Sequence, residues 1–178
     1  MFDMSYRAFA VLQRPEIRRE LKLTKEQNST IDEMIKTFTR EAQATRGQGG
    51  RIAAMGRLEE TDKKLVDVLD APQRQRLFEI RIQIRGATAL SDPEVSSKLD
   101  LTDDQRLKIK TTRSEALQKL MTTLQKGIRN GLEKASEDIS KAEEIDLLNI
   151  LTTPQKEMFV KMAGVPFKGA RPKGSWPI

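Results

Sequence analysis

The chain has 178 residues, of which 33% are charged and only 4% are aromatic, and its net charge is +6. This supply of apolar residues favours long helices with one narrow apolar stripe each over a thick globular core. The sequence contains no cysteine and no histidine, which removes disulfides, the usual ligands of zinc and copper and the commonest general base. We therefore expect no metal, no cofactor and no enzymatic activity.

The distribution of charged and apolar residues bears on two further classes of protein. Acidic and basic residues alternate along the chain, and the basic excess lies partly in the C-terminal tail, which favours solvated helix faces over a nucleic-acid-binding surface. No apolar run approaches the roughly 20 residues that a membrane-spanning helix needs. The opening residues carry an acid where a signal peptide has basic residues. The sequence leaves open whether the chain is cytoplasmic or follows a removed leader.

The first half of the chain is predicted to contain a short helix and a helical hairpin. The pair Pro15 and Glu16 opens a helix of about two turns. Three residues separate Thr24 from Gln27, so the Thr24 side chain can cap a helix while Gln27 bonds back to the Thr24 amide, which makes a capping box. The long helix that follows carries an apolar stripe and ends at the glycines of 47–50.

The return helix of this hairpin leads to a second box. Asp70 can act as the cap with Gln73 as its partner, and Pro72 falls in the first turn, where its missing N–H costs little. Residues 80–85 alternate apolar and polar side chains as a strand does, but the Asp70 cap opens a helix into them. We therefore predict a helix there.

The second half of the chain repeats the first. Residues 90–109 match 12–31 at an offset of 78 positions, and 147–162 match 65–80 at an offset of 82. The difference of four residues is about one helical turn, so the second copy should have one more turn in its middle and one fewer near its end. Its two boxes pair Thr102 with Gln105 and Thr152 with Gln155.

These elements predict an all-α protein built as an elongated bundle of helical hairpins. The expected parts are an N-terminal segment at 1–11, a first hairpin unit at 12–86, a second hairpin unit at 87–167 and a basic tail at 168–178. Each hairpin must bury its apolar stripe, and the cheapest partner is the matching stripe of the other copy. The two units, related by internal duplication, are therefore expected to form a pseudo-dimer.

The apolar stripes also supply the candidate binding surface. Methionines lie on or near them, and methionine serves both as core filling and as an adaptable contact with varied partners. Arg74, Arg76, Arg81 and Arg85 could form an anion-binding site or a solvated face opposite the apolar residues of the same helix. The candidate apolar binding face consists of Ile31, Met34, Ile35, Phe38, Leu117, Leu120, Met121, Leu124 and Ile128.

The four boxes resemble those of the LTXXQ-motif (Spy/CpxP-like) family of bacterial periplasmic proteins. Early boxes at 23–27 and 101–105 and late boxes at 69–73 and 151–155 give this chain the family's motif set twice. The late boxes carry proline one place later than the family's LTPxQ pattern, and Asp70 replaces a threonine. The resemblance implies a cradle-shaped all-α fold, export to the periplasm, and either ATP-independent binding of unfolded proteins or damping of envelope-stress signalling.

On these grounds we expect a non-enzymatic, exported helical binding protein that acts as a Spy-like chaperone or stress modulator. The rival hypothesis is a structural or adaptor protein with a dedicated partner, and a weaker one is a basic nucleic-acid binder. An exposed apolar face would favour the chaperone. An apolar stripe buried within the protein would favour the structural or adaptor protein, and a continuous face of arginines and lysines would favour the nucleic-acid binder. The sequence leaves the oligomeric state open.

Overall fold

The structure, a computed structural model, describes residues 7–44, 50–125 and 132–168. Within these residues all the regular secondary structure is helical, so the protein is all-α as predicted. The chain divides into two compact units, one ending at Arg81 and the other beginning at Ile82. The division falls inside helix α5 (Ala71–Arg85), before the predicted boundary at residue 86.

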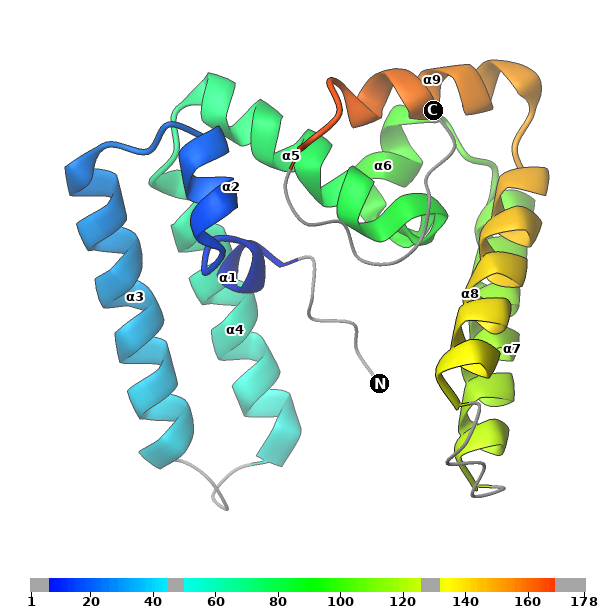
Figure 1. Cartoon of the computed structure of the whole chain (residues 1–178), viewed down its shortest axis with the longest axis horizontal. Helices are drawn as coiled ribbons and strands as arrows, with labels where there is room; N and C mark the ends of the chain where they lie inside the picture. Colours follow the sequence, from blue (N-terminus) through cyan, green and yellow to red (C-terminus); the bar gives the residue numbers. More distant parts are fainter. Residues whose placement is uncertain (1–6, 45–49, 126–131, 169–178) are drawn as a thin grey trace. The chain divides into compact units, whose positions relative to one another are not determined.

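Unit 1 is built on the hairpin of α3 (Lys25–Ala44) and α4 (Gly50–Asp67), which lie side by side in Figure 1. Two short helices, α1 (Ala8–Val11) and α2 (Pro15–Glu20), precede the hairpin, and α5 follows it. Helix α1 packs against α4, so part of the predicted N-terminal segment belongs to unit 1. The buried side chains of this unit include Leu12, Ile17, Ile31, Leu65 and Leu77.

Unit 2 has the same order of helices around the hairpin of α7 (Asp103–Gln125) and α8 (Leu132–Asn149) (Figure 1). The 3₁₀-helix η1 (Gly86–Ser91) and helix α6 (Pro93–Lys98) precede the hairpin, and α9 (Thr153–Ala163) follows it. Helix η1 packs against both α7 and α8. The buried side chains of unit 2 include Leu90, Val95, Ile109, Leu147 and Phe159.

The helix lengths follow the two shifts in sequence offset. Helices α4 and α8 both have 18 residues, whereas α7 has 23 residues against 20 in α3. Helix α9 has 11 residues against 15 in α5, and each is followed by a glycine with positive φ, Gly86 (55°) and Gly164 (63°). These differences of three and four residues are close to one helical turn, and the internal duplication stays a prediction. Residues 80–85 lie within α5, so the helix predicted there is confirmed.

Helices α2 and α6 end in the same way. The backbone is left-handed at Lys22 (φ 51°) and Asp100 (φ 48°), a conformation that residues other than glycine rarely adopt. In unit 1 the Leu23 amide donates to the Arg18 carbonyl (3.2 Å), which is the long hydrogen bond of a Schellman motif. The Leu101 amide makes the matching bond in unit 2 (3.1 Å). This turn sets the direction in which the first capping box of each unit starts its long helix.

Candidate functional site

All four predicted capping boxes are formed. In the first, the Thr24 amide donates to Gln27 Oε1 (3.0 Å) and the Gln27 amide donates to Thr24 Oγ1 (3.1 Å). The same two bonds, at 2.8–3.4 Å, are made by Asp70 with Gln73, Thr102 with Gln105 and Thr152 with Gln155. Each box thus gives partners to two amides that have none within the helix.

The glutamines of the boxes also join the two boxes of each unit. In unit 1, Gln27 Nε2 donates to Gln73 Oε1 (2.7 Å) and Gln73 Nε2 donates back to Gln27 Oε1 (3.0 Å). Gln27 Nε2 donates as well to the Val68 carbonyl, just after α4 (3.0 Å). Gln105 and Gln155 form the equivalent reciprocal pair in unit 2 (2.7 and 3.1 Å). The box residues therefore hold helix starts together, which is a structural role.

In unit 1 the predicted apolar binding face takes part in the packing of the unit itself. Ile31 is completely buried, and Phe38 lies edge-on to Phe9 of α1, with ring centroids 4.8 Å apart. Met34 and Ile35 are half-buried. The prediction that Ile31 belongs to a binding face is therefore wrong, because the core of unit 1 covers its side chain completely.

In unit 2 the matching side of α7 is open. Leu117, Met121 and Leu124 have 39%, 49% and 47% of their surface exposed, and Leu120 is half-buried. We call these four residues the α7 face. The remaining predicted member, Ile128, lies outside the described residues. Large apolar side chains of the long helix are thus presented to solvent in unit 2.

The side chains that meet where the first short helix lies on the hairpin differ in size between the units. Phe9 and Phe38 of unit 1 correspond, at the offset of 78, to Ala87 and Ala116 of unit 2. Both alanines are buried, at 1% and 8% exposure, but a pair of alanines covers far less surface than a pair of phenylalanines. The next large apolar residue on α7, Leu117, has 39% of its surface exposed.

A hollow between α7 and α8 lies on the other side of α7 from this face. Its volume is about 670 Å³, and the side chains that line it are mainly polar, among them Glu115, Lys119 and Asp138. At 3.6 residues per turn, Lys119 points about 160° away from Leu117 and from Met121 around the helix axis. The hollow and the α7 face are therefore separate surfaces of the hairpin.

Two carboxylates that were not among the predicted site residues lie beside the short first helix of each unit. Asp62 Oδ1 on α4 accepts a hydrogen bond from the Phe9 amide in α1 (2.9 Å). Glu144 on α8 lies near the Ala87 amide of η1, close enough for this amide to lower the pKa of the carboxyl group. Helices this short are stable only when other parts of the protein hold them. The sequence does contain a signal for them. Positions 62 and 144 both carry an acid, and they are 82 positions apart, which is the offset that relates 65–80 to 147–162.

Burial raises the pKa of both carboxylates above the ordinary value. For Asp62 desolvation is the largest influence, and the bond from the Phe9 amide and the charges of Arg81 and Arg7 lower the pKa in part. Desolvation also raises the pKa of Glu144, and the nearby Ala87 amide lowers it in part. Burial acts in this way because it disfavours the charged form of a carboxyl group.

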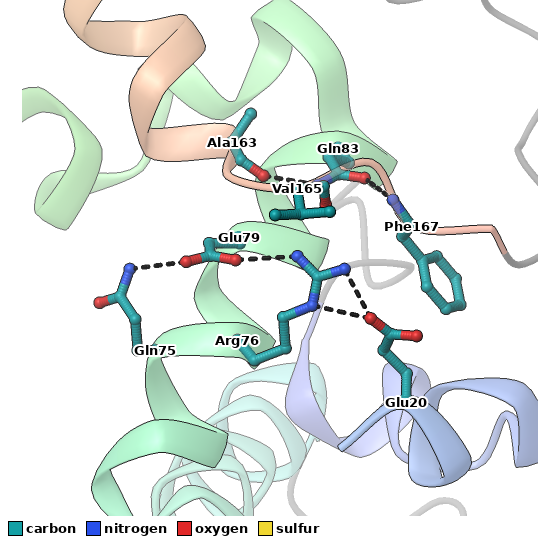
Figure 2. Close-up of polar contacts among 8 residues, drawn as sticks. All are labelled: Glu20, Gln75, Arg76, Glu79, Gln83, Ala163, Val165 and Phe167. Carbon is teal, nitrogen blue, oxygen red and sulfur yellow. Dashed lines mark hydrogen bonds and ion pairs between the residues drawn. The ribbon is translucent and has the colours of Figure 1, made fainter. Parts of the chain in front are cut away.

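Two of the four arginines predicted on α5, Arg76 and Arg85, take part in ion pairs. Arg76 lies between two carboxylates, with Nη2 2.6 Å from Glu20 and Nη1 2.8 Å from Glu79 (Figure 2). Arg85 Nη1 lies 3.3 Å from Asp92 Oδ2, and only 5% of its side chain is exposed. The carboxylates of Glu20 and Asp92 thus join α5 to the short helices α2 and α6, and the charges of Arg76 and Arg85 are used in these ion pairs.

A glutamine side chain fastens the end of unit 2 to α5. Gln83 Nε2 donates to the carbonyls of Ala163 and Val165, and Gln83 Oε1 accepts a hydrogen bond from the Phe167 amide (2.6 Å) (Figure 2). The Phe167 side chain is buried, with 7% of its surface exposed. The residues that follow α9 are thus bound to the last turn of α5, where unit 2 begins.

No protein-family model, curated protein or solved structure matches the chain. The resemblance of the boxes to the LTXXQ-motif family therefore stays a prediction. Within the described ranges, none of the helices is long and apolar enough to cross a membrane. Over the same residues, no three acidic side chains come together in a way that could hold a metal ion.

Proposed function

We propose that the protein is a non-enzymatic binding protein that holds apolar segments of unfolded or partner proteins on the α7 face. The observation that carries the proposal is the exposure of Leu117, Met121 and Leu124 on one side of one helix. Single exposed apolar residues are common on protein surfaces, but several on adjacent turns form a continuous patch of the kind that binds partners. Met121 adds a flexible side chain that adapts to different shapes.

The size of this face supports weak and reversible binding. Burying apolar surface contributes about 25 cal/mol per Å², so a few half-exposed side chains can hold a segment without fixing it in place. Such binding needs no nucleotide. Together with the family resemblance, it supports an ATP-independent, Spy-like chaperone or envelope-stress modulator, and export to the periplasm is part of the same proposal.

A structural or adaptor protein with a dedicated partner is the second candidate. It is favoured by unit 1, where Ile31 is buried and Phe38 packs on Phe9, so that half of the predicted face serves the fold. A chaperone should act on several unrelated clients, whereas an adaptor should act on one.

Light scattering of an unfolding model client tests the proposal. The full chain should reduce aggregation without nucleotide, and the double variant Leu117→Ser, Leu124→Ser should protect much less. Ile145→Ser is the matched control, because Ile145 is 60% exposed but lies on α8. Absence of protection at any ratio would leave the adaptor hypothesis ahead. Protection that is lost in high salt would assign the binding to the charged surface instead.

A further inference from the structure

One side of α7 is basic in its first half and apolar in its second. Side chains at intervals of four or three residues run through Arg106, Lys110, Arg113, Leu117, Met121 and Leu124. At 3.6 residues per turn, these six positions lie within about 80° of one another around the helix axis. They therefore form one line along the helix, and three residues of the α7 face make up its second half.

Arg113 marks the border between the two halves. Its Nη1 donates to Ser91 Oγ (2.7 Å) and to the Thr88 carbonyl (3.0 Å) in η1, and its Nε lies 3.6 Å from Glu143 Oε1 on α8. These contacts fix the guanidinium one turn before Leu117. The last positive charge of the line is thus held in place about one helical turn before Leu117.

The basic half keeps an excess of positive charge. Three basic residues, Arg106, Lys110 and Arg113, lie on this side of α7 together with one acid of the first turn, Asp103, and Glu143 on α8 pairs with Arg113. Arg106 and Lys110 are both exposed. The next acid along α7 after its first turn is Glu115, which points about 160° away from Leu117.

We infer that this line of side chains on α7 takes a protein segment that is acidic at one end and apolar at the other. Its acidic residues lie against Arg106 and Lys110, and its apolar residues lie on Leu117, Met121 and Leu124. From Lys110 to the α7 face is roughly 10–20 Å at 1.5 Å per residue, which an extended chain covers in about three to six residues. The inference rests on the proposed function and adds the order and spacing of the groups that are bound.

Fluorescent peptides of equal length test this order and spacing. One carries two aspartates, a spacer of five neutral residues and two leucines; a second has asparagines in place of the aspartates; a third has the aspartates next to the leucines. At low salt the first should bind the full chain about two- to five-fold more tightly than the other two, as one or two exposed ion pairs allow. High salt should remove the difference, because it screens exposed charges.

Charge variants locate the effect on α7. Lys110→Glu should abolish the preference for the spaced acidic peptide, whereas Lys119→Glu, the same change of charge on the opposite side of the helix, should leave it unchanged. Glu143→Gln should increase the preference, since it removes an acid that competes for Arg113. Circular dichroism of each variant checks that it is folded.

The outcomes separate the two proposals. Equal binding of the spaced acidic peptide and the asparagine peptide, equal binding of the two acidic peptides, or equal effects of Lys110→Glu and Lys119→Glu would overturn this inference alone. Binding of none of the peptides would overturn the proposed function as well.

Discussion

At the residue scale, each box glutamine makes hydrogen bonds in two directions. Gln27 Oε1 accepts from the Thr24 amide in its own box and from Gln73 Nε2 in the other box of the unit. Gln27 Nε2 donates to Gln73 Oε1 and to the Val68 carbonyl. An amide side chain offers two N–H donors and an oxygen with two lone pairs, so the full capacity of Gln27 is in use. A glutamate in its place would lack both donors.

The first prediction concerns the caps. Replacing Thr24 or Thr102 with alanine should lower the free energy of unfolding by about 0.5–2 kcal/mol, because the Gln27 or Gln105 amide loses its acceptor. Serine at either position should be nearly neutral, since the hydroxyl is retained. Chemical denaturation of the four variants and the wild type measures both effects. Alanine variants as stable as the wild type would mean that the boxes do not hold the helix starts.

At the element scale, helix starts are local and therefore readable from sequence. Caps and first-turn prolines act within a few residues, and the helices after Thr24, Asp70, Thr102 and Thr152 begin where these signals place them. In contrast, the side chains that cover an apolar stripe can come from residues far away in the sequence. Phe38 is covered by Phe9, a residue far from it in the chain, and no periodicity in α3 itself indicates this contact. For the same reason the sequence did not reveal which predicted stripe would stay exposed.

The docking of α1 should depend on pH through Asp62. Its pKa is raised above the ordinary value of 3.8 in the folded protein, so the folded state holds the proton more tightly than the unfolded state. The resulting stability is fully present below the ordinary pKa and is lost as the pH rises through the folded pKa. Asp62→Asn should remove this contribution, while its side-chain oxygen can still accept from the Phe9 amide.

Urea denaturation of the wild type and Asp62→Asn between about pH 3 and pH 8 measures this contribution as a difference between two profiles. The stability of the wild type relative to the variant should fall as the pH rises. The titration of the other carboxylates affects both proteins and cancels in the comparison. Parallel profiles would show that Asp62 has the same pKa in the folded and unfolded chains.

At the scale of the whole molecule, the structural similarity between the units begins earlier than the sequence repeat indicates. Residues 8–11 and 86–89 share no identical residue at the offset of 78, yet each places a backbone amide beside a carboxylate of the return helix, Phe9 beside Asp62 and Ala87 beside Glu144. The shared feature is a backbone amide, which every residue except proline has. Sequence identity therefore could not indicate it, and the predicted units began at 12 and 87.

The last prediction is that the backbones of the two units superpose. In an experimental structure of the full chain, residues 12–86 should fit 90–164, with one extra helical turn left out between Gln105 and Gly131. Left-handed residues at the same offset, Lys22 and Asp100, and the reciprocal glutamine pairs fix the helix directions within each unit. The fit should extend to the carboxylates, placing Asp62 on Glu144. Hairpins that cross at different angles in the two units, or carboxylates that fall on different turns, would remove the case for a duplicated unit, because one backbone would then no longer describe both halves.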